Sequence, residues 1–115
     1  MKSFNDRAVL DMPSAIAETA FYREFSDAQY NALQLGLYPE GTDDRWFVYM
    51  KNDWLYVHRS WTGHCIFKLK IAGTDDVYKS TLLQVNRDSN QYRSTDIGAD
   101  IAELNSVLDT KLASV

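Results

Sequence analysis

The residues from Arg45 to Ile71 decide the fold, and they read RWFVYMKNDWLYVHRSWTGHCIFKLKI. Runs of β-branched and aromatic residues are separated here by turn-forming residues at 51–53 and 60–63, a pattern typical of strands joined by hairpins. A further turn at 73–76 leads to a fourth apolar run over 77–85. Because connections this short join only antiparallel neighbours, residues 45–86 are predicted to form a four-stranded antiparallel β-meander.

Helical patterns flank this predicted sheet. Residues 13–25 place apolar side chains on one stripe, and Ser26 with Gln29 has the form of a capping box that begins a second short helix. Residues 94–113 repeat apolar residues at spacings of three and four, which predicts a C-terminal helix. We therefore expect one α+β domain over 1–115, with three helices packed on one face of the sheet. Its parts are a helical N-terminal segment and loop (1–44), the sheet (45–86) and the C-terminal helix (94–113).

The composition is that of an ordinary globular domain. The chain has 115 residues, of which 45% are hydrophobic, and this is enough to bury a core. Its single cysteine, Cys65, cannot form an intrachain disulfide. The N-terminus does not resemble a signal peptide, and no run of about 18 apolar residues occurs. These features predict a cytoplasmic protein without a membrane span.

Charge is distributed unevenly along the chain. Residues 1–44 carry three Lys/Arg against eight Asp/Glu (−5), residues 45–93 carry eight against four (+4), and residues 94–115 carry one against four (−3). The predicted sheet is therefore basic and both of its flanks are acidic. The net charge of −4 argues against nucleic acid as a partner. The basic sheet either serves a local anion site or only pairs with the flanks and with solvent.

Strand alternation assigns side chains to the two faces of the predicted sheet. Alternation from the apolar Val57 sends Tyr56 and His58 to the outer face, together with Lys68 of the next strand. By the same rule Cys65 points toward the helices. Aromatic rings beside cations suit a planar anionic ligand such as a nucleotide, through stacking and cation–π contacts. The alternative is that the rings only cover a half-exposed sheet.

The segment HRSWTG at 58–63 is dense in groups that can bind phosphate. Arg59 can hold a phosphate through two parallel hydrogen bonds, Ser60 and Thr62 can donate hydroxyls, and Trp61 can stack on a ring. The same residues also suit a plain hairpin turn, in which the glycine permits a positive φ and the tryptophan covers the core.

Catalytic and metal-binding patterns are missing from the sequence. His58, His64 and Cys65 lack the spacing of a zinc site, and a cysteine in the core behaves as a small hydrophobic residue. No Gly-x-Gly-x-x-Gly, Walker or Gly-x-Ser-x-Gly motif occurs. We therefore predict no catalytic residue, no metal and no cofactor.

Two blocks of the sequence are similar to a known family. The first contains DRWFVYM at 44–50, DWLYVHRSWTG at 53–63 and CI at 65–66, and the second contains VNRD at 85–88 and QYRSTD at 91–96. Both resemble a small bacterial family associated with macrodomain proteins of ADP-ribose metabolism. The resemblance implies that one ligand site spans two strand ends and is formed by Arg59, Trp61, Thr62, Asn86 and Arg87.

Three functions are compatible with the sequence. The first is a non-catalytic binding module for an ADP-ribose-like or other nucleotide or phosphate ligand. Its ligand-binding residues would be Tyr56, His58, Arg59, Ser60, Trp61, Thr62, Asn86 and Arg87. The second is a small protein-binding inhibitor, such as an immunity or anti-defence protein, whose acidic flanks steer a basic partner. The third is a small hydrolase acting on an ADP-ribose linkage, with Asp44, Asp88 or His58 as acid or base.

Overall fold

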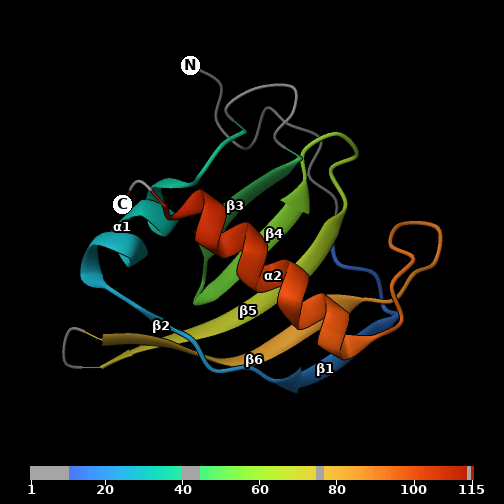
Figure 1. The fold of residues 1–115 in the computed structure, drawn as a ribbon, viewed down its shortest axis with the longest axis horizontal. Coiled ribbons are helices and arrows are strands. Elements are labelled where there is room, and N and C mark those ends of the chain that lie inside the picture. Colours follow the sequence, from blue (N-terminus) through green and yellow to red (C-terminus); the bar gives the residue numbers. More distant parts are fainter. Residues whose placement is uncertain (1–10, 40–44, 75–76, 114) are drawn as a thin grey trace.

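The computed structural model describes residues 11–39, 45–74, 77–113 and 115, and these form one antiparallel sheet with two helices (Figure 1). In chain order the elements are β1 (Ile16–Ala20), β2 (Glu24–Phe25), α1 (Asp27–Leu35), β3 (Trp46–Lys51), β4 (Trp54–Arg59), β5 (Cys65–Thr74), β6 (Val77–Asn86) and α2 (Ile97–Lys111). The strands of the six-stranded sheet lie in the order β1-β6-β5-β4-β3, and β2 also pairs with β6.

The prediction of a four-stranded meander with three helices is wrong, whereas the α+β class and the antiparallel sheet are confirmed. In place of a first helix over 13–25, the chain forms β1 and β2. β1 pairs with β6 from Leu82 to Asn86, and β2 pairs with it at Tyr78 and Lys79. Without these two strands the outer edge of β6 would leave backbone N–H and C=O groups unpaired. Pairing with this edge therefore outweighs the helical spacing of the apolar residues.

Both described helices pack on the same face of the sheet (Figure 1). Leu33 of α1 and Leu104 and Leu108 of α2 are fully buried in the core that they share with the strands. The strand residues of this core include Val48, Leu55, Val57, Ile66, Phe67, Leu69, Leu83 and Val85. Neither described helix lies on the opposite face, which we call the helix-free face.

The helix ends are defined by side-chain caps. The predicted capping box is confirmed, because Gln29 N donates to Ser26 Oγ (3.1 Å) and Ser26 N donates to Gln29 Oε1 (3.0 Å). α2 begins at Ile97, where Asp96 Oδ1 accepts a hydrogen bond from Gly98 N (2.9 Å). Neither helix is long and apolar enough to cross a membrane, within the part of the chain that the structure describes.

A β-bulge interrupts the pairing of β4 with β5. Val57 lies opposite Phe67, but the next pair is His58 with Cys65, so Ile66 is an extra residue on β5. The bulge reverses the alternation: Ile66 joins the core, and Cys65 shares the helix-free face with His58. The prediction that Cys65 points toward the helices is wrong for this reason, although its side chain is buried.

Candidate functional site

The tip of the β4–β5 hairpin, residues 59–64, is held by backbone hydrogen bonds. Gly63 N donates to Arg59 O (2.8 Å), and Ser60 N donates to Arg45 O (2.7 Å), which joins the tip to the start of β3. Gly63 has a φ of 80°, a conformation that favours glycine. The positive φ therefore explains why glycine occupies this position of the HRSWTG segment. The turn also fixes the position from which the Arg59 side chain extends.

The guanidinium group of Arg59 lies between two aromatic rings. Its central carbon is 5.0 Å from the ring centroid of Trp46 and 5.9 Å from that of Tyr92. Its Nε is buried and has no hydrogen-bond partner in the part of the chain that the structure describes. Among the described residues, no carboxylate forms an ion pair with Arg59. The group is thus held by cation–π contacts, while its Nε–H has no acceptor among the described residues.

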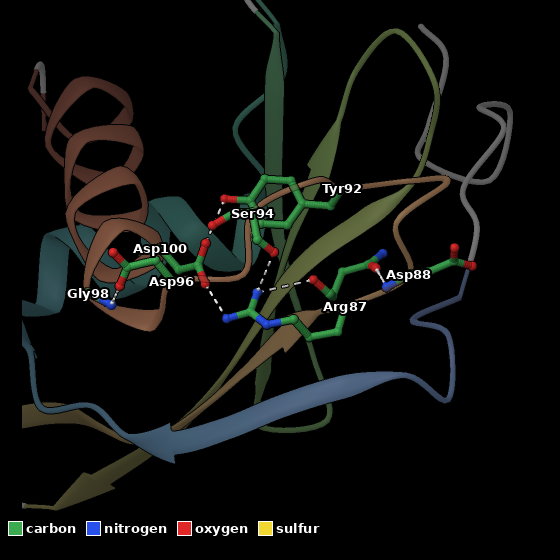
Figure 2. Close-up of polar contacts among 8 residues, drawn as sticks. Arg87, Asp88, Tyr92, Ser94, Asp96, Gly98 and Asp100 are labelled. Atoms are coloured by element: carbon green, nitrogen blue, oxygen red, sulfur yellow. Dashed lines mark hydrogen bonds and ion pairs between the residues drawn. The ribbon is translucent and has the colours of Figure 1, made fainter.

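A buried ion pair holds one of these rings in place (Figure 2). Tyr92 Oη donates to Asp100 Oδ1 (2.9 Å), and Arg87 Nη2 contacts Asp100 Oδ2 (2.5 Å). The Asp100 side chain has no exposed surface, and Arg87 also donates to Ser94 O (3.3 Å). Burial, followed by the hydrogen bond to Asp100 and its charge, raises the pKa of Tyr92 to about 12. Arg87 therefore contributes to the position of the Tyr92 ring, and through that ring it is linked to Arg59.

Asn86 connects β5 to the loop that carries Tyr92. It is fully buried, and its Nδ2 donates both to Cys65 O (2.9 Å) and to Gln91 Oε1 (2.8 Å). Its Oδ1 accepts a hydrogen bond from Asp88 N (2.8 Å). These bonds use both donors of the amide and one acceptor position. Asn86 therefore organises the loop from inside the protein.

His58 fixes the hairpin tip from the helix-free side of the sheet. Its side chain is buried, with Nδ1 2.9 Å from Gly63 O and Nε2 3.3 Å from Tyr49 Oη. Because a carbonyl oxygen only accepts, Nδ1 carries the proton, and Nε2 of the neutral ring accepts from the tyrosine. Burial lowers the pKa of His58, and the hydrogen bond to Gly63 opposes this shift only in part. A neutral His58 thus supports the turn that presents Arg59.

The other predicted ligand residues lie in two places. Trp61, at the hairpin tip, is 67% exposed, with the guanidinium of Arg45 5.2 Å from its ring centroid. Ser60 and Thr62 flank it, and Thr62 Oγ1 accepts a hydrogen bond from His64 N (3.3 Å). Tyr56 lies on the helix-free face beside Lys68, whose Nζ is 5.1 Å from its ring centroid.

The structure brings only part of the predicted ligand set together. Arg87 is linked to Arg59 only indirectly, through Asp100 and Tyr92, and Trp61 lies in the same turn as Arg59. Tyr56 and His58 lie on the other side of the sheet, and Asn86 is inside the protein. Whether these residues bind a ligand stays a prediction.

Sequence reasoning missed the residues that hold Arg59 in place. Trp46 and Tyr92 were visible only as members of the two sequence blocks, and Asp100 carried no signal beyond its place near the start of a helix. For Trp46, the sequence did offer strand alternation. Trp46 is two residues from the buried Val48, so both side chains point to the helix-covered face.

The described residues near Arg59 include few groups that could act as an acid, a base or a metal ligand. Asp88 Oδ1 accepts a hydrogen bond from Asn90 N (2.9 Å), and Asp44 lies outside the described residues. No group of three or more His, Cys, Asp or Glu residues in the described ranges is arranged to hold a metal ion. Comparison of the chain with models of protein families, with curated proteins and with solved structures finds no match.

Proposed function

We propose that this protein is a non-catalytic binding module for a nucleotide-like or ADP-ribose-like ligand, and that Arg59 binds its phosphate. The observation that carries the proposal is the guanidinium of Arg59, which lies between Trp46 and Tyr92 without an ion pair to a described residue. Guanidinium presents parallel N–H groups that match two oxygens of a phosphate.

The energetics of Arg59 support this assignment. A buried N–H without an acceptor costs roughly 1–3 kcal/mol, and Arg59 Nε is such a group. Two cation–π contacts offset part of this cost, each worth about 0.5–1 kcal/mol at partly exposed sites. Because the flanking rings hold the guanidinium, little side-chain entropy would be lost when an oxyanion binds.

The ligand's planar group is assigned to Trp61. This tryptophan is 67% exposed and lies two residues from Arg59 in the same turn. A large ring at the surface offers a stacking surface for a base. Its neighbour Arg45 adds a second positive charge at the tip.

Binding is favoured over hydrolysis by the state of the nearby acids. Asp100, the carboxylate linked to Arg59 through Tyr92, is fully buried and paired with Arg87. His58 is buried as well, with both ring nitrogens in contact with protein groups. A general acid or base must reach the reacting group of the substrate, and neither side chain is placed to do so.

The experiment is a thermal-shift titration with ADP-ribose, AMP and inorganic phosphate. A ligand at about 100 times its Kd adds roughly 2.7 kcal/mol of stability, which raises Tm by about 10 °C in a domain of this size. Arg59→Gln should abolish the shift, and Arg59→Lys should restore little of it, because an ammonium lacks the parallel N–H groups.

Arg23→Gln is the matched control. Arg23 donates to Asn105 Oδ1 (2.8 Å) and forms an ion pair with Asp109 (2.9 Å), and it lies outside the Arg59 site. This variant removes the same charge, so it should lower Tm and still show the ligand-induced shift. An Arg59→Gln protein that responds to ADP-ribose like the wild type would refute the assignment of Arg59.

A further inference from the structure

A second cationic cluster lies on the helix-free face. Strand pairing places Lys51 and Lys70 on either side of Trp54, and it places Lys68 beside Tyr56 in the next row. Nζ of Lys68 is 4.7 Å from the ring centroid of Trp54, and Nζ of Lys70 is 5.2 Å from it. We call Lys51, Trp54, Lys68 and Lys70 the Trp54 patch.

The three ammonium groups of the Trp54 patch are not neutralised within the described part of the chain, because no carboxylate there forms an ion pair with them. Burial raises the pKa of Tyr56 and the charge of the nearby Asp11 adds to this shift, but Asp11 forms no ion pair with the three lysines. Glu18 lies on the same face, and it accepts a hydrogen bond from Gln84 Nε2 (2.9 Å) on the far side of Lys68. Asp53 belongs to the adjacent turn. The patch is therefore a local concentration of positive charge on a protein whose net charge is negative.

We propose that the Trp54 patch binds single-stranded nucleic acid, with the lysines on phosphates and a base stacked on Trp54. Aromatic rings within a cationic surface are the combination that single-stranded nucleic acids require. Stacking a base on the indole would offset the loss of the two cation–π contacts that it displaces. The lysines released from the ring would then reach the backbone of the strand.

The form of the surface selects a polymer over other occupants. Sites for free nucleotides are concave and enclose most of the ligand, whereas the Trp54 patch spreads over three neighbouring strands of the helix-free face. Protein interfaces are depleted of lysine at their centre, but here lysines surround the only tryptophan of this face in the described region.

The negative net charge limits the strength of the binding. Only the three lysines of the patch would neutralise phosphates, so the logarithm of the affinity should fall with the logarithm of salt concentration with a slope of about −2. Binding should therefore be weak, measurable at low salt and lost at physiological salt. The proposal departs from the expectation that nucleic acid is not a partner, because that expectation rested on the net charge and the proposal rests on the local charge of the patch.

Fluorescence anisotropy of a labelled dT oligonucleotide, measured over a series of salt concentrations, tests the proposal. Lys68→Gln/Lys70→Gln should reduce the magnitude of the salt slope by about 1.4 and weaken binding at low salt at least about tenfold. The control Lys79→Gln/Lys111→Gln has the same net charge as Lys68→Gln/Lys70→Gln, but both of its substitutions lie outside the patch. It should bind the oligonucleotide like the wild type. Trp54→Leu should weaken binding about 5- to 150-fold.

Three outcomes would overturn the proposal. One is the absence of binding at low salt. Another is an equal loss in the two lysine double variants, which would indicate attraction by overall charge alone. The third is displacement of the oligonucleotide by an equimolar amount of its mononucleotide, which would indicate a small-molecule site. Lys68→Gln/Lys70→Gln should keep the thermal shift with ADP-ribose, so failure of this proposal and failure of the proposed ADP-ribose site are separable.

Discussion

Removing the carboxylate of Asp100 should destabilise the protein more than any surface substitution. Asp100 is fully buried, and its two oxygens interact with Tyr92 and with Arg87, whose side chain is 17% exposed. Asp100→Ala would leave the Arg87 charge without a partner in the interior, a change that costs about 3–5 kcal/mol. Since a domain of this size is stable by only about 5–15 kcal/mol, this is at least a fifth of the total.

Urea denaturation followed by far-ultraviolet circular dichroism measures this loss. With m values of about 1–3 kcal/mol/M, the midpoint should fall by at least about 1 M. Arg87→Ala/Asp100→Ala should be more stable than the sum of the single losses predicts, with a coupling of about 0.5–3 kcal/mol. Tyr92→Phe should cost less, about 1–3 kcal/mol, because it removes one hydrogen bond and keeps the ring beside Arg59.

Two results would refute this reasoning. If Asp100→Ala costs less than about 1 kcal/mol, within the range of a surface pair, the buried ion pair does not hold the loop. If the Arg87 and Asp100 effects simply add, the two side chains stabilise the protein independently. Tyr92→Leu provides the functional link: it removes the ring against Arg59, so it should also abolish the thermal shift with ADP-ribose, which Tyr92→Phe should retain.

Three further predictions concern the hairpin and its bulge. Because the pKa of His58 is lowered in the folded protein, the unfolded chain takes up a proton at a higher pH than the folded one. The free energy of unfolding should therefore be at its full value above about pH 6.5 and decrease as the pH falls below it. The urea midpoint should depend less on pH in His58→Gln than in the wild type. Cys65 is fully buried with a pKa raised to about 12, so the native protein should not react with a thiol reagent at pH 8, and rapid native labelling would contradict its burial. Gly63→Ala should cost about 1–2 kcal/mol because φ is 80°, and an unchanged melting temperature would show that the turn relaxes.

The sequence predicted those features that depend on strand periodicity. Tyr56 and Lys68 do share a face, because they lie opposite each other in the pairing of β4 with β5. Periodicity could not reveal the extra residue Ile66. A bulge arises from the pairing of two strands, and the sequence of one strand alone does not show it. It also could not show that residues 16–20 complete the sheet, because their partner on β6 lies far along the chain.

The candidate site was predictable in its residue types and not in its arrangement. The segment HRSWTG at 58–63 identified Arg59. Because Arg59 is two residues from Val57 in one strand, both side chains point to the helix-covered face. The ring of Tyr92 reaches Arg59 from a loop, and no periodicity governs a loop. The partner of Arg87 could not be inferred either, because Asp100 comes from a separate helix.

The place of β1 in the sheet has a consequence for synthesis of the protein. Among the strands of the described residues, β1 leaves the ribosome first, yet its pairing partner β6 emerges last. Such non-local pairing is slow to form, and a nascent chain paused before residue 77 would carry Ile16–Ala20 without its partner strand β6. The first strand made is therefore the one that must wait longest, and a translational pause within the β5–β6 hairpin would prolong that wait.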